Sequence, residues 1–88
     1  MCRNIKTLFN FEPPATQEEI QAAAEQYVRK ISGFAKPSSV NEKAFNQAIK
    51  AVSRASTEML GSMVTNAPPR NREIEAEKAH QRALLRFG

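Results

Sequence analysis

The chain has very few residues of the kinds that build disulfides, metal sites and catalytic centres. Its 88 residues include no aspartate, no tryptophan, one cysteine and one histidine. A single cysteine cannot form an internal disulfide, which fits a reducing compartment, and we expect a cytoplasmic protein. One cysteine and one histidine also fall short of the four ligands that a structural zinc site requires.

Long apolar runs are also missing. No stretch approaches the roughly 18 residues of a membrane span, and no apolar region of a secretory signal follows Arg3 and Lys6. The sequence has no glycine-rich phosphate loop, no helix-turn-helix pattern and no set of aromatic residues for stacking on bases. Hydroxyl side chains are plentiful, but no base is placed to activate them, so a non-enzymatic protein is favoured.

The composition that remains is that of one small globular domain spanning residues 1–88. Hydrophobic residues make up 41% and charged residues 25%, which is too apolar for a disordered chain. A domain of this size buries only about 60–65% of its unfolded surface. Its core is therefore thin, and a partner or a second copy of the chain would add to it.

The first helix is predicted over residues 17–32. Thr16 and Glu19 have the spacing of a capping box, and Gly33 is suited to the left-handed turn that ends a helix. Apolar residues recur every three or four positions, which gives one buried stripe: Ile20, Ala23, Ala24, Tyr27, Val28 and Ile31.

Two further helices are predicted, over residues 40–65 and 69–86. Ser39 and Glu42 suggest a second capping box, and Pro68 or Pro69 a third helix start. The interior Gly61 permits a close helix approach or marks a loosened last turn. The third helix has a poor apolar stripe, so we expect it to be the least stable element or to gain contacts in a dimer.

Residues 1–15 form a lead segment in which Ile5, Leu8 and Phe9 match one helical turn begun at Asn4. These side chains are expected to cap one end of the first two helices. The sequence shows no defensible strand pattern. The predicted fold is therefore an all-α, small three-helix domain, in which the first two helices form an antiparallel hairpin. Its core is predicted to include the following residues: Val28, Ile31, Phe45 and Ile49.

Four stretches of the chain carry a resemblance to a known family. They read MCRNIKTLFNFEPPAT, EEIQAAAEQYVRKISGF-KPS, VTNAPPR-REIEAEKA and the terminal RFG. They resemble a small family of bacterial proteins, domain-of-unknown-function family 2277, with MCRNI as its opening signature. The resemblance implies a bacterial, soluble, single-domain protein and supplies no activity, cofactor or partner.

Cys2 is the first candidate for chemistry. If Met1 is removed, the free α-amino group and the thiol lie close enough to chelate one metal ion or to attack one electrophile together. Arg3 beside the thiol would favour the thiolate, which is the ligand and nucleophile. The alternative is a small apolar side chain packed under the lead segment.

His80 is the second candidate metal ligand. Glu77 precedes it by three residues, which is the spacing of carboxylate-bridged di-iron helical bundles. Such a centre needs two copies of the motif and two further carboxylates, whereas this chain has one copy. A solvent-exposed histidine is therefore the favoured interpretation.

Basic residues of the last third give a possible anion-binding surface: Arg70, Arg72, Lys78, Arg82 and Arg86. The net charge of +4 is weak evidence for nucleic acid, because such surfaces are usually solvated and internally paired, as Glu75 with Lys78 would be. The sequence thus favours a protein-binding or self-associating module. Two alternatives stay open, a metal-binding or redox protein using Cys2 and a weak nucleic-acid binder.

Overall fold

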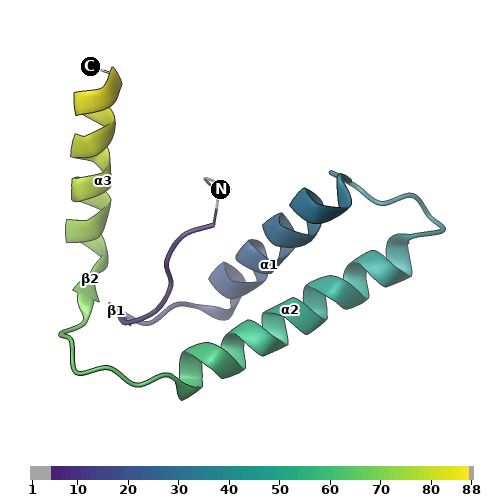
Figure 1. The fold of residues 1–88 in the computed structure, drawn as a ribbon, viewed down its shortest axis with the longest axis horizontal. Helices are drawn as coiled ribbons and strands as arrows, with labels where there is room; N and C mark the ends of the chain where they lie inside the picture. Colours follow the sequence, from purple (N-terminus) through teal and green to yellow (C-terminus); the bar gives the residue numbers. More distant parts are fainter. Residues whose placement is uncertain (1–4, 88) are drawn as a thin grey trace.

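The computed structural model describes residues 5–87, which form three helices linked by one short strand pair (Figure 1). In chain order the elements are β1 (Phe11–Glu12), α1 (Gln17–Ser32), α2 (Glu42–Ser62), β2 (Arg70–Asn71) and α3 (Arg72–Phe87). Helices α1 and α2 pack against each other as an antiparallel hairpin. The predicted all-α class with three helices is confirmed.

Local sequence signals fix both ends of α1. The Thr16 hydroxyl accepts a hydrogen bond from the Glu19 N–H at 3.2 Å, and the Thr16 N–H donates to the Glu19 carboxylate at 2.9 Å. Gly33 has a φ of +78°, and its N–H donates to the Arg29 carbonyl at 3.0 Å. The predicted capping box and left-handed glycine cap are both confirmed, since each depends only on neighbours in the sequence.

The expected capping box of α2 is wrong. The helix is capped at Asn41, and a turn in which the Asn41 N–H donates to the Ser38 carbonyl precedes it. Ser39 lies inside this turn, too early to reach the first helical N–H groups. At the other end Met63 is extended, so α2 stops at Ser62 rather than at residue 65. Open space surrounds Gly61, so it supports no close helix approach.

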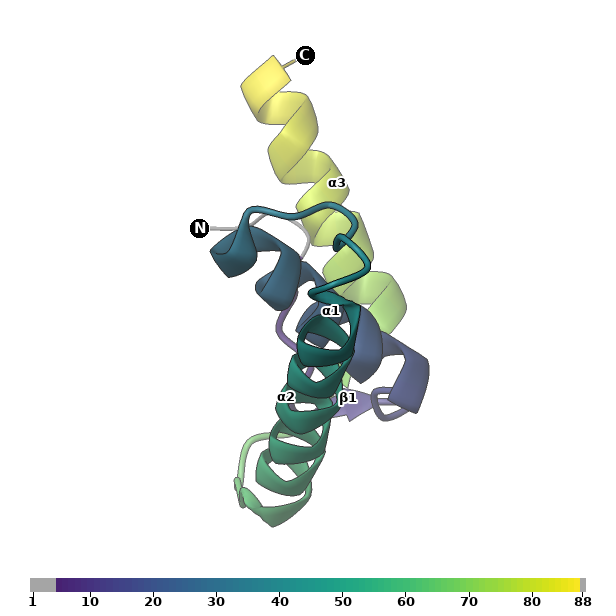
Figure 2. The same ribbon diagram turned by 90° about the vertical axis from the view of Figure 1, so that its right-hand side faces the viewer.

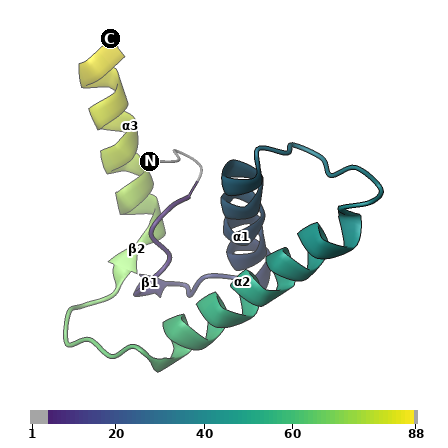
Figure 3. The ribbon, with the colours of Figure 1, turned by 45° about the vertical axis from the view of Figure 1, so that its right-hand side comes forward.

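The core lies between α1 and α2 and is thin. Ile20, Ala24 and Val28 are buried one turn apart on α1, and Ser53 is buried opposite them on α2. Phe45 and Ile49 are half-buried, whereas Ile31 is 66% exposed, so its predicted place in the core is wrong. Figure 3 shows why: the two helices separate toward their connecting loop, which leaves the last turn of α1 uncovered.

The lead segment is not helical over residues 5–9. It runs extended to a turn at Asn10, whose φ is +62°, and then forms β1. Strand β1 pairs in parallel with β2, and the Arg70 N–H donates to the Asn10 carbonyl at 2.8 Å. This strand pair was not predicted, because two residues are too few to show an alternating pattern. Leu8 and Phe9 still lie near the open end of the hairpin, in a cavity also lined by Ile20 and Leu60.

Helix α3 begins at Arg72 and not at the prolines. The Asn71 side chain accepts a hydrogen bond from the Ile74 N–H at 3.0 Å, which is the bond of a helix N-cap. The extended residues of β2 separate this cap from Pro68 and Pro69, so the predicted start is wrong. From there α3 projects away from the hairpin (Figures 1 and 2).

The molecule is open rather than compact. Its Cα radius of gyration is 15.6 Å, whereas a compact chain of this length has a radius of about 12 Å. Because α3 lies apart from the hairpin, its apolar side chains Ile74, Leu84 and Leu85 remain exposed. The shape thus follows from the position of α3.

Candidate functional site

Arg72 joins the start of α3 to the start of α1. Its two terminal nitrogens donate to the two carboxylate oxygens of Glu19 at 2.9 and 2.8 Å. The same guanidinium donates to the backbone carbonyls of Pro13 at 2.8 Å and Pro14 at 3.1 Å. A two-pronged pair of this kind has a fixed geometry as well as charge. Arg72 is therefore occupied within the fold.

The pair shifts the ionisation of both partners. Hydrogen bonding from Arg72 and then from the Thr16 backbone lowers the pKa of Glu19 from 4.5 to about 2. Hydrogen bonding to Glu19 likewise raises the pKa of Arg72. A lowered carboxyl pKa means that the folded state favours the charged form, so the pair stabilises the fold only while Glu19 is ionised.

Low pH is expected to break the ion pair between Arg72 and Glu19. The stabilisation is complete above the ordinary Glu19 pKa of 4.5 and is lost as the pH falls through about 2. An NMR titration of the Glu19 carboxyl carbon should therefore show a midpoint near 2. In an Arg72→Gln variant the midpoint should rise toward the ordinary value. Equal midpoints in the two proteins would contradict the pair.

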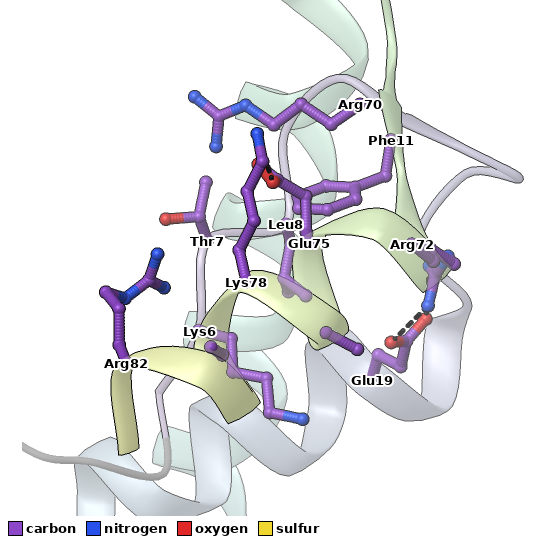
Figure 4. Close-up of a pocket in the computed structure, with 12 residues that line it drawn as sticks. Lys6, Thr7, Leu8, Phe11, Glu19, Arg70, Arg72, Glu75, Lys78 and Arg82 are labelled. Atoms are coloured by element: carbon purple, nitrogen blue, oxygen red, sulfur yellow. Dashed lines mark hydrogen bonds and ion pairs between the residues drawn. The ribbon is translucent and has the colours of Figure 1, made fainter. Parts of the chain in front are cut away.

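A cleft of about 660 Å³ lies beside this link, between the lead segment and α3 (Figure 4). The lead segment contributes Lys6, Thr7, Leu8 and Phe11, and the rest come from Glu19, the strand β2 and one side of α3. We refer to this space as the α3 cleft. Twelve residues line it: Lys6, Thr7, Leu8, Phe11, Glu19, Arg70, Arg72, Glu75, Ala76, Lys78, Ala79 and Arg82.

The α3 cleft is strongly basic. Five cations and two carboxylates line it, which leaves a net charge of +3. Lys78 pairs with Glu75 at 3.4 Å, as the sequence predicts. The guanidinium carbons of Arg70 and Arg72 lie 5.8 and 5.9 Å from the centre of the Phe11 ring, within the range of cation–π attraction.

The structure brings together only part of the predicted basic surface. Arg70, Lys78 and Arg82 line the α3 cleft, Arg72 is held by Glu19, and Arg86 lies beyond the lining residues. Lys6, Thr7 and Phe11 were missed by the sequence analysis. Their place depends on the pairing of β1 with β2, which joins residues about 60 positions apart and leaves no local signal.

The predicted metal ligands gain no support within residues 5–87. Cys2 lies outside the described residues, so its aminothiol hypothesis stays a prediction. His80 is exposed on α3, and Glu77 accepts a hydrogen bond from Gln81 at 3.2 Å. Among the described residues no group of three or more histidine, cysteine, aspartate or glutamate side chains is placed to hold a metal ion.

The sequence predicts no membrane span, and the lengths and apolar content of the described helices can be compared with that expectation. None of those within residues 5–87 is both long enough and apolar enough to cross a bilayer.

Comparison with known proteins gives one family and no further match. No curated protein and no solved structure matches the chain. A family model described as an uncharacterised conserved protein, DUF2277, matches residues 1–78. The match covers the lead segment, the hairpin, the strand pair and the first half of α3. The chain therefore belongs to the DUF2277 family of uncharacterised conserved proteins.

Proposed function

We propose that this protein is a non-enzymatic module that works by pairing with a second copy of itself through α3. The observation that carries the proposal is the exposed area. The chain exposes 7255 Å², whereas a compact monomer of this length exposes about 5,200 Å². The difference of about 2,000 Å² is about two and a half times the roughly 800 Å² per partner that a standard interface buries. One chain alone leaves enough surface uncovered to support a dimer.

Part of that surface is apolar and lies on α3. Leu84 is 55% and Leu85 88% exposed, and Ile74 is also exposed. At 100° per residue Leu84 falls opposite Glu75, Ala79 and Arg82, which line the α3 cleft, whereas Ile74 and Leu85 lie beside Lys78 at one edge of the cleft. Met59 and Met63, at the end of α2, are exposed as well. Packing of α3 against α3 would cover this surface as far as the edge of the cleft at Lys78.

The charge order along α3 favours an antiparallel pair. Glu73, Glu75 and Glu77 occupy the first half of the helix, and Arg82 and Arg86 occupy the second. In a two-fold dimer with antiparallel helices the acidic half of one helix lies alongside the basic half of the other, with Arg82 and Arg86 on the cleft side of α3 and not on the Leu84 side. Such complementarity along the helix favours the antiparallel direction more than it adds affinity. The proposal therefore specifies both the occupant and its direction.

Sedimentation of the full chain at tens of micromolar is expected to show a dimer. The double variant Leu84→Arg, Leu85→Arg should weaken the dimer at least about tenfold, because it places charge among the apolar side chains of the proposed interface. Val40→Arg is the matched control: Val40 is 87% exposed but lies in the loop before α2, so this variant should remain dimeric.

Two outcomes would overturn the proposal. One is a monomeric wild-type chain whose α3 amides are nonetheless strongly protected from hydrogen exchange, since α3 would then find its partner within one chain. The other is a dimer that the Leu84, Leu85 variant and the Val40 variant weaken equally.

A further inference from the structure

We propose that the α3 cleft binds a small phosphate-bearing ligand of the size and kind of a nucleoside monophosphate. The cleft volume of about 660 Å³ lies within the range of small-molecule sites, about 300–1,000 Å³. Its net charge of +3 favours a negatively charged ligand. Nothing in the pairing of α3 with a second copy requires this site, so the two proposals are independent.

The cations of the cleft differ in what they already bind. Arg72 is held by Glu19 at 2.8 Å, and Lys78 is paired with Glu75 at 3.4 Å. Among the described residues no carboxylate forms an ion pair with Lys6, Arg70 or Arg82. These three cations come from the lead segment, β2 and α3, and an anion bound among them would relieve their mutual repulsion.

Arg70 and Arg82 are suited to a phosphate group. All three residues Thr7, Arg70 and Arg82 line the cleft, and in Figure 4 the two guanidinium groups and the Thr7 hydroxyl lie on the same side of the view. A guanidinium presents a planar fork of donors that matches two oxygens of a phosphate, and a hydroxyl adds one further donor. Two guanidinium groups and one hydroxyl offer more donors than the two oxygens of a carboxylate ligand would accept from, so a phosphate group is the better match.

The remaining lining is apolar and suits the body of a nucleoside. Leu8, Phe11, Ala76 and Ala79 contribute ring and methyl surface to the cleft. A heterocyclic base is flat and apolar on its faces, and it gains from contact with such groups as well as from arginine planes. The polar opening and the apolar lining together match a ligand with one charged end and one flat end.

A small ligand fits better than a nucleic-acid polymer. Binding a polymer requires cations that continue along a surface for several nucleotides. The basic residues Lys43, Lys50 and Arg54 instead lie on α2, an element that contributes no lining to the cleft. The basic residues of the cleft therefore do not continue onto α2 as a track for a polymer.

The test is a titration of the ¹⁵N-labelled full chain with adenosine monophosphate, followed by NMR. We expect saturable shifts confined to the amides of Thr7, Phe11, Arg70 and Ala79. Adenosine, which lacks the phosphate, should bind at least about tenfold more weakly, and inorganic phosphate should bind but more weakly than the nucleotide. The double variant Arg70→Gln, Arg82→Gln should weaken nucleotide binding at least about tenfold.

The control is Arg54→Gln, which removes a positive charge from exposed α2 and should leave nucleotide binding unchanged. Unchanged circular dichroism and an intact Glu19 titration would establish that the double variant is folded. Three results would overturn the proposal: no saturation by the nucleotide at millimolar concentration, equal losses in the double variant and the control, or binding of an oligonucleotide without binding of the mononucleotide.

Discussion

Replacing Ile20 with alanine is expected to lower the free energy of unfolding by about 2–4 kcal/mol. Ile20 is 6% exposed and lies near the open end of the α1–α2 hairpin, where it also lines the cavity shared with Phe9 and Leu60. Few other side chains are buried as deeply, so the remaining core has little capacity to close around the space that is left. For a domain of this length the loss is a large share of the total stability.

The matched control is Ile31→Ala, on the same helix. Ile31 is 66% exposed, so this variant should change the free energy of unfolding by less than about 1 kcal/mol. Urea denaturation followed by circular dichroism measures both variants, with the slope of the transition checked for constancy. Equal losses at the two positions would mean that α1 presents a different face to α2.

Replacing Arg72 with glutamine is expected to release α3 and β2 from the hairpin. The variant loses the paired bonds to Glu19 and the bonds to the Pro13 and Pro14 carbonyls. The most direct readout is the Arg70 N–H, which donates to the Asn10 carbonyl across the strand pair. Its protection from hydrogen exchange should fall at least about tenfold, while the amides of α1 and α2 keep theirs.

A second variant separates the ion pair from the helix cap. Glutamine at position 19 still completes a capping box with Thr16, so Glu19→Gln removes the charge and keeps the cap. It should expose the Arg70 N–H as Arg72→Gln does, and the double variant should add little to either single change. An Arg70 N–H that stays protected in Glu19→Gln would show that the proline carbonyls hold Arg72 without the carboxylate.

The sequence predicts structure well where the signal is local. The Thr16 cap, the Gly33 turn and the Glu75–Lys78 pair each involve residues within four positions, and the structure contains all three. The starts of α2 and α3 were misplaced, because other turn and cap residues, Asn41 and Asn71, stand next to the residues chosen. Competing caps a few positions apart are not resolved by spacing alone.

The candidate site was less predictable than the helices. Its basic residues on α3 follow from the sequence, but their neighbours in the lead segment do not. Phe11 lies beside Arg70 only because β1 pairs with β2, and the entire α1–α2 hairpin separates these two strands in the sequence. Arg72 was expected at a solvated surface, and its partner lies 53 positions away on another helix. Such contacts depend on tertiary packing, which leaves no periodicity to read.

The double use of the Glu19 carboxylate has an evolutionary consequence. One side chain closes the cap of α1 with Thr16 and also holds Arg72 at the start of α3. A change at position 19 to a residue other than glutamine therefore disturbs two elements at once, and a change at position 72 leaves the Glu19 carboxylate without its arginine partner. We therefore expect substitutions at positions 16, 19 and 72 to be coupled, so that a loss at one of them is best compensated by a change at its partner.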